Sequence, residues 1–153
     1  MDEYLDNHCN FLSLSSSSSS SPNNNRYHNP MVAISPKHML CQSIRKLEIG
    51  NNQYNDETMT ELIVNDFPNL QLIDIGCNSF TFVRRATFSN LPVLKEITIG
   101  YASFRKVDTS SQIEGGDGIC CIEKCDQLKT VKLSNLVFFD YHSLQIKGNT
   151  INR

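Results

Sequence analysis

One eleven-residue pattern occurs four times in the chain, and every copy has apolar residues at its positions 1, 4, 6 and 11. The copies read IRKLEIGNNQY, LQLIDIGCNSF, LKEITIGYASF and LKTVKLSNLVF, and they begin at Ile44, Leu70, Leu94 and Leu128. In a chain that is 39% hydrophobic, sixteen apolar positions out of sixteen arise by chance with a probability of ~3 × 10⁻⁷ for one chosen frame. Position 11 is also aromatic in every copy. The pattern therefore predicts stacked structural repeats.

The copies are separated by 26, 24 and 34 residues, so their spacing varies although their apolar pattern does not. The long third interval contains turn-forming residues, among them Ser110, Ser111, Gly115 and Gly116. We interpret the extra length as a loop inserted into a repeat.

A second apolar pattern precedes each of the last three copies. Alternating apolar pairs occur at Leu62 and Val64, Ala86 and Phe88, and Cys120 and Ile122. A period of two is typical of a strand, so each repeat is expected to contain two short extended segments. Residues 56–61 have helical composition with Asn55 or Asp56 as a candidate N-cap, which predicts a helical turn there.

The pattern L-x-x-L-x-L-x-x-N-x-L resembles that of the leucine-rich repeat family. Asn52 and Asn78 match its asparagine, whereas Ala102 and Leu136 replace it in the last two copies. The segment I-x-I-G-x-x-S-F is also similar to the BspA-type subclass, and the residues leave the subclass open. In the family, the asparagine satisfies backbone groups where the chain leaves the strand, so irregular third and fourth turns are expected.

The resemblance implies an α/β or mostly-β fold. It predicts a right-handed leucine-rich-repeat solenoid of about four coils, with a parallel sheet on one face and short return strands or turns on the other. Position 7 is small in every copy (Gly50, Gly76, Gly100 and Ser134), which predicts either a tight backbone path or a shallow groove.

Two regions are expected along the chain. Residues 1–30 are rich in serine and asparagine, a composition that predicts a disordered tail. Residues 31–153 contain the repeats and are expected to form the solenoid. The acidic residues Asp2, Glu3 and Asp6 stand where a signal peptide would be basic, which favours a cytoplasmic protein and otherwise leaves the compartment open. Leu144 and Ile146 resemble one more strand pair, so the sequence predicts either a degenerate final turn or an incomplete last coil. An incomplete coil would expose an apolar edge that favours self-association.

Several kinds of chemistry are disfavoured. The cluster Cys120, Cys121 and Cys125 lacks a fourth zinc ligand at standard spacing. Repeat positions predict that Cys120 and Cys125 lie in the core and that Cys77 and Cys121 point outward. A net charge of −2 argues against nucleic acid as a partner, and no apolar run is long enough to span a membrane. No nucleophile–base pair appears, so we expect no enzyme activity and no cofactor.

The remaining function class is a non-enzymatic module that binds a partner protein through the outward face of the repeat sheet. Positions 3, 5 and 8 point outward, and the candidate binding residues among them are Lys46, Glu48, Asn51, Leu72, Asp74, Glu96, Thr98, Tyr101, Thr130, Lys132 and Asn135. The alternative, implied by the BspA-type resemblance, is a surface-display or adhesin-like repeat protein.

Overall fold

The computed structural model of the protein describes residues 11–14, 31–34, 43–105 and 118–148. These residues form ten strands in two five-stranded sheets and contain no helix. The front sheet contains, in spatial order, β1 (Phe11–Leu14), β3 (Lys46–Ile49), β5 (Leu72–Ile75), β7 (Glu96–Ile99) and β9 (Thr130–Leu133). The back sheet contains β10 (Tyr141–Lys147), β8 (Gly118–Glu123), β6 (Arg85–Ser89), β4 (Glu61–Asn65) and β2 (Met31–Ile34).

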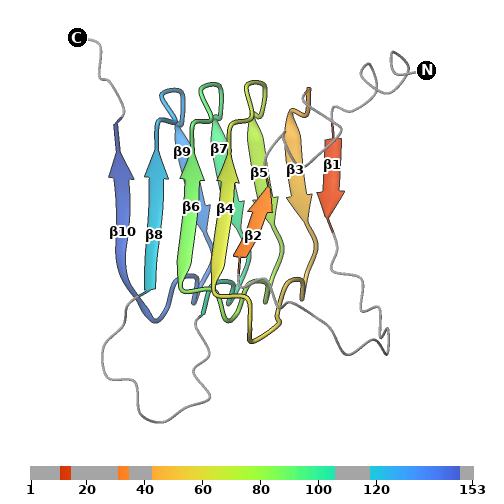
Figure 1. Cartoon of the computed structure of the whole chain (residues 1–153), viewed down its shortest axis with the longest axis vertical. Helices are drawn as coiled ribbons and strands as arrows, with labels where there is room; N and C mark the ends of the chain where they lie inside the picture. Colours follow the sequence, from red (N-terminus) through yellow and green to blue (C-terminus); the bar gives the residue numbers. More distant parts are fainter. Residues whose placement is uncertain (1–10, 15–30, 35–42, 106–117, 149–153) are drawn as a thin grey trace.

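The chain alternates between the two sheets, and each front strand with the back strand that follows it forms one repeat unit. All pairings in both sheets are parallel. Figure 1 shows the back strands β4, β6, β8 and β10 side by side, pointing opposite to β1 and β3 of the front sheet. The fold is therefore mostly β, which agrees with one of the two fold classes that the sequence left open.

Equivalent residues of successive units lie directly beside one another. Leu47 is opposite Ile73, and Ile73 is opposite Ile97 in turn. In the back sheet, Leu62, Ala86 and Cys120 form a corresponding row. The apolar positions therefore form continuous columns, as the repeated pattern predicts.

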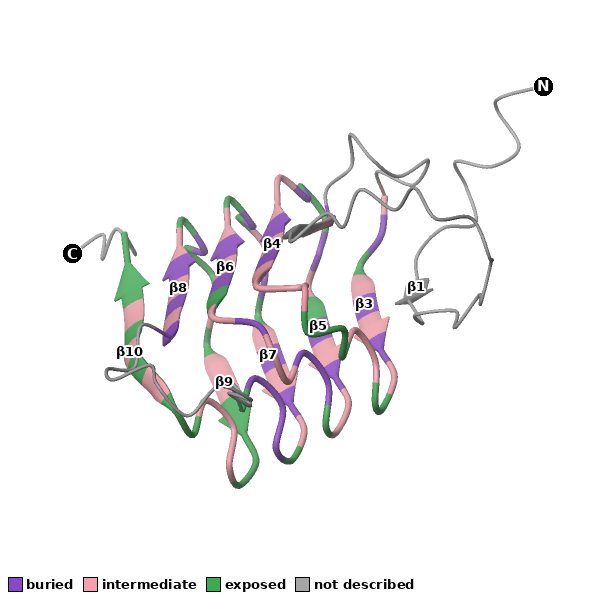
Figure 2. Ribbon diagram, turned by 60° about the horizontal axis from the view of Figure 1, so that its bottom comes forward, coloured by how far each residue is buried: buried purple, intermediate pink, exposed green. Residues whose placement is uncertain are grey.

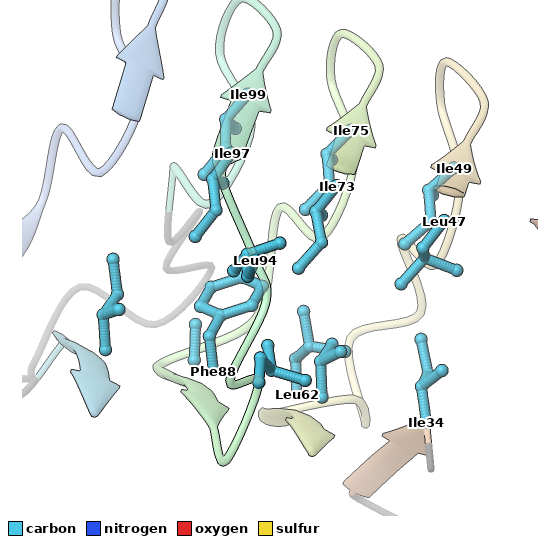
Figure 3. Close-up of a cluster of buried hydrophobic side chains, with 14 of the residues drawn as sticks. Ile34, Leu47, Ile49, Leu62, Ile73, Ile75, Phe88, Leu94, Ile97 and Ile99 are labelled. Atoms are coloured by element: carbon cyan, nitrogen blue, oxygen red, sulfur yellow. The ribbon is translucent and has the colours of Figure 1, made fainter. Parts of the chain in front are cut away.

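The core lies between the two sheets. Figure 3 shows the isoleucine and leucine pairs of β3, β5 and β7 pointing toward Leu62, Phe88 and Ile34 from the back sheet. The first three copies of the pattern have their positions 1, 4 and 6 fully buried. In the fourth copy, by contrast, Leu128 and Val131 are half-buried and Leu133 is exposed, because no described strand covers β9 on its far side.

The aromatic residues at position 11 stack in one column, as expected from their position in the repeat. Ring centroids are 5.1 Å apart between Tyr54 and Phe80, 5.0 Å between Phe80 and Phe104, and 5.2 Å between Phe104 and Phe138. Tyr141 of β10 joins this column, because its ring contacts both Phe104 and Phe138 and its hydroxyl donates a 2.6 Å hydrogen bond to the Val83 carbonyl. Burial raises the pKa of the Tyr141 hydroxyl.

One local prediction is wrong. Residues 56–61 form no helical turn, because the Asp56 carboxylate accepts hydrogen bonds from both the amide and the hydroxyl of Thr58 and closes a turn instead. Strand β1 lies inside the segment 1–30, for which the sequence predicts a disordered tail, and its four residues pair with β3 at the edge of the front sheet. The other residues of that segment lie outside the described ones.

The small residues at position 7 allow successive backbones to approach closely. A Cβ atom on Gly100 would lie 2.6 Å from the carbonyl carbon of Gly76, and one on Gly76 would lie 2.7 Å from that of Gly50. Both distances are too short for any side chain. Of the two alternatives, the structure therefore supports the tight backbone path.

We expect Gly100→Ala to lower the free energy of unfolding by about 1–3 kcal/mol, since its methyl group meets backbone atoms that cannot move aside. Gly50→Ala is the matched control, because a Cβ there has its nearest neighbour, Gln53 Cγ, at 3.6 Å. Urea unfolding followed by circular dichroism measures both variants. Equal destabilisation by the two substitutions would contradict the close approach.

Candidate protein-binding face

The outward side chains of the front sheet form straight rows across four strands. One row contains Lys46, Leu72, Glu96 and Thr130, and the next contains Glu48, Asp74, Thr98 and Lys132. Position 8 adds Asn51, Cys77, Tyr101 and Asn135 in the loops that follow the strands. The sequence-predicted binding residues therefore lie on the outward side of the front-sheet strands or in the loops that follow them, and each is half-buried or exposed.

Charges of both signs occupy this face. Lys46 Nζ lies 3.0 Å from Glu48 Oε2 on the same strand, and Lys132 Nζ lies 2.9 Å from Glu96 Oε1 on the neighbouring strand. Thr98 donates a 3.2 Å hydrogen bond to the same Glu96 oxygen. The hydrogen bond from Lys132 lowers the pKa of the Glu96 carboxyl, so this group stays ionised to lower pH than an ordinary glutamate.

The two most hydrophobic candidates, Leu72 and Tyr101, do not form one patch. Leu72 is opposite Glu96 at the start of the strands, and Tyr101 lies five residues beyond Glu96 along the chain. At ~3.3 Å per residue, the strand from Glu96 to Ile99 alone separates them by about 10 Å. Leu72 is 39% exposed and Tyr101 48%, so each presents a separate apolar contact on a polar face.

The loops that carry position 8 share one backbone geometry. Asn52, Asn78, Ala102 and Leu136 at position 9 all have positive φ values of 52–61°. The amide of each of the first three donates a hydrogen bond to the position 8 carbonyl of the next unit, at 2.8–3.0 Å. The expected irregularity of the third and fourth loops is therefore wrong, because alanine and leucine adopt the same left-handed conformation that asparagine favours.

Side chains of neighbouring positions satisfy the loop backbone. The Asn51 carbonyl oxygen Oδ1 accepts a 2.8 Å hydrogen bond from the amide of Cys77 in the next unit. Asn55 bonds the same loop of the next unit: its Oδ1 accepts a hydrogen bond from the Thr81 amide, and its Nδ2 donates one to the Asn78 carbonyl. The family asparagine was expected at position 9, whereas the amide groups that bond the backbone here belong to positions 8 and 12.

Two buried serines at position 10 link three successive units. Ser79 Oγ accepts a hydrogen bond from the Gln53 amide and donates one to the Gly50 carbonyl, at 3.1 and 2.8 Å. Ser103 Oγ repeats this one unit later, with the Ser79 amide at 3.0 Å and the Gly76 carbonyl at 2.7 Å. Sequence reasoning missed this role. The identical S-F ending of the second and third copies was the only sign of it.

The cysteines separate into two environments, as their repeat positions predict. Cys120 and Cys125 are buried in the core, whereas Cys77 and Cys121 are half-buried, and all four carry free thiols. Burial raises the pKa of the Cys120 thiol to about 12 and that of Cys125 to about 11. Cys41 and Cys9 lie outside the described residues.

The described part of the chain contains no group of three or more histidine, cysteine, aspartate or glutamate side chains arranged to hold a metal ion. It also contains no helix of sufficient length and apolar character to cross a membrane.

In comparisons with protein-family models, curated proteins and solved structures, nothing matched this chain.

We expect Ser103→Ala to lower the free energy of unfolding by about 1–3 kcal/mol, because it leaves the buried Ser79 amide without its acceptor. Ser134→Ala, at an exposed position of the next loop, should change it by less than about 0.5 kcal/mol. Thermal and urea unfolding of the two variants provide the test. A destabilisation as small as that of the control would contradict a role for the serine column.

Alkylation should distinguish the adjacent residues Cys120 and Cys121. The thiolate is the reactive form, and at pH 8 only about one Cys120 thiol in ten thousand is ionised when its pKa is about 12. Among the four described cysteines, brief iodoacetamide treatment of the native protein at pH 8 should therefore label Cys77 and Cys121 before Cys120. Tandem mass spectrometry locates the label, and equal labelling of Cys120 and Cys121 at pH 8 would refute the assignment.

Proposed function

We propose that this protein is a non-enzymatic binding module whose partner protein docks on the outward face of the front sheet. The observation that carries the proposal is the register: positions 3 and 5 form two unbroken rows across four strands, and their inward neighbours fill the core. The outward side chains therefore vary without cost to the fold, whereas the inward ones do not. Outward side chains on such a surface can change to recognise a partner protein while the core stays intact.

We also infer that the alternating units are coils of a right-handed solenoid of the leucine-rich-repeat type. Its support is the apolar columns, the exclusively parallel pairing, and the return of the chain to the same sheet in every unit. Connections between parallel strands of one sheet are right-handed in nearly all proteins. In such a solenoid, the front sheet is the surface that is uniform enough to bind an extended partner.

The chemistry of the face favours a partner with both polar and apolar contacts. Tyr101 and Leu72 offer two separated apolar anchors, and charged side chains of both signs lie between and beside them. Aromatic anchors surrounded by polar groups are typical of protein interfaces. Asp74, on the central strand β5, stands in the same row as Glu48 of β3 and adds negative charge to this part of the face.

The test is charge reversal on the two faces of the molecule. A partner is first recovered with the intact chain by cross-linking and then purified, so that its affinity is measured directly. We expect Glu48→Lys combined with Asp74→Lys to weaken binding by at least about tenfold, because the reversal changes four units of charge at the interface.

The matched control is Glu61→Lys combined with Glu123→Lys, which makes the same charge change on the outward face of the back sheet. It should alter the affinity by less than about twofold. Unfolding temperatures verify that both double variants remain folded. Equal loss of affinity in the two double variants would exclude the front sheet as the binding face.

A further inference from the structure

Strand β10 lies at one end of the back sheet, and none of its residues is buried. Its inward side chains Leu144 and Ile146 are 45% and 53% exposed, although their neighbours in register on β8, Cys120 and Ile122, are buried. Figure 2 shows β10 as exposed and half-buried residues beside the buried residues of β8. Because little of their apolar surface is removed from water, these two side chains contribute little to holding β10 in place.

The residue that attaches β10 to the core is Tyr141, at the start of the strand. Its ring centroid lies 4.8 Å from that of Phe138 and 6.4 Å from that of Phe104. Its hydroxyl donates the 2.6 Å hydrogen bond to the carbonyl of Val83, which lies 58 residues earlier in the chain. The ring and the hydroxyl therefore join the start of β10 to earlier parts of the two sheets.

The first residue of β8 is a glycine that leaves room for this tyrosine. A Cβ atom on Gly118 would lie 2.9 Å from both Cγ and Cδ1 of Tyr141, which is too short for any side chain. Gly118 does not have a positive φ, so its backbone conformation does not require glycine. The close approach of Tyr141 does.

The thiol of Cys120 lies beneath this part of the structure. Its inward row runs from Leu62 through Ala86 to Cys120 and ends at Leu144 of β10, so β10 covers Cys120 on the side away from β6. The Tyr141 hydroxyl is also close to Cys120, because the charge of this thiol contributes to the raised pKa of the tyrosine. Cys120 is only 1% exposed, and it becomes accessible when β10 moves away.

We propose that β10 is a latched strap, which opens as one unit to uncover Cys120 while the preceding units stay folded. Tyr141 is the latch, because its side chain joins the strand to the rest of the fold. The buried core cluster contains no residue of β10, so opening exposes Cys120 and Ile122 but removes no member of the cluster. Segments with few buried apolar contacts open locally at a lower free energy than the whole domain. The strap thereby controls when this buried thiol can react.

Alkylation of Cys120 measures how often the strap opens. The experiment uses the full chain carrying Cys121→Ser, which removes the more accessible neighbouring thiol, and iodoacetamide at pH 8 under native conditions. Tandem mass spectrometry follows the labelling of Cys120 over time. Tyr141→Phe removes only the hydroxyl that bonds the Val83 carbonyl, so we expect it to raise the labelling rate of Cys120 by at least about threefold.

Ile73→Val is the matched control, because it removes one methyl group from the buried core on β5 and lowers the free energy of unfolding by a comparable amount. Strap opening leaves this core intact, so the control should keep the labelling rate of Cys120 within about twofold. Urea unfolding midpoints verify that both variants are folded. Acceleration in Tyr141→Phe alone supports the strap. Equal acceleration in the two variants, which means that Cys120 reacts only after global unfolding, or an unchanged rate in Tyr141→Phe would overturn it.

Discussion

Parallel pairing in both sheets is the constraint on which the rest of this structure depends. It places equivalent residues of successive units beside one another at a strand separation of ~4.8 Å. A residue at any position therefore has its own counterparts as nearest neighbours: isoleucine contacts isoleucine in the front strands, and aromatic rings lie 5.0–5.2 Å apart along position 11. An inward column therefore accepts only apolar side chains that pack against the equivalent residues of neighbouring units.

The same constraint governs polar groups. A buried hydroxyl is acceptable at position 10 because the next unit supplies both a donor and an acceptor, as Ser79 and Ser103 demonstrate. The glycines are necessary for a related reason, since two successive backbones approach too closely at Gly76 and Gly100 for any side chain. On the outward face the constraint is absent. Charge, amide, hydroxyl and aromatic side chains can succeed one another there, which is the basis of the proposed binding role.

Much of the packing was predictable from the residues alone, whereas the loops were not. The repeated pattern predicts the apolar columns and the return strands, because burial alternates from residue to residue along each strand. It also predicts which cysteines are buried: Cys120 is buried, whereas Cys77 and Cys121 are half-buried. The left-handed conformation of Ala102, whose amide bonds the Asn135 carbonyl, and the addition of β1 to the front sheet depend on contacts with other units. The turn at Asp56 is local, and no repeated pattern signals it. The candidate face was predicted as a set of residues. Its ion pairs and the wide separation of Leu72 from Tyr101 required the register between strands.

The connection between Arg105 and Gly118 changes the length of a repeat without changing the register of its strands. The interval between equivalent residues increases from 24 to 34 there, yet Arg85 and Ile119 are still paired in the same register that joins Glu61 to Arg85. Loop length and strand alignment are thus independent variables. Evolution can lengthen, shorten or replace that connection while every neighbouring unit keeps its alignment, so new sequence can be acquired at this point without redesign of the scaffold.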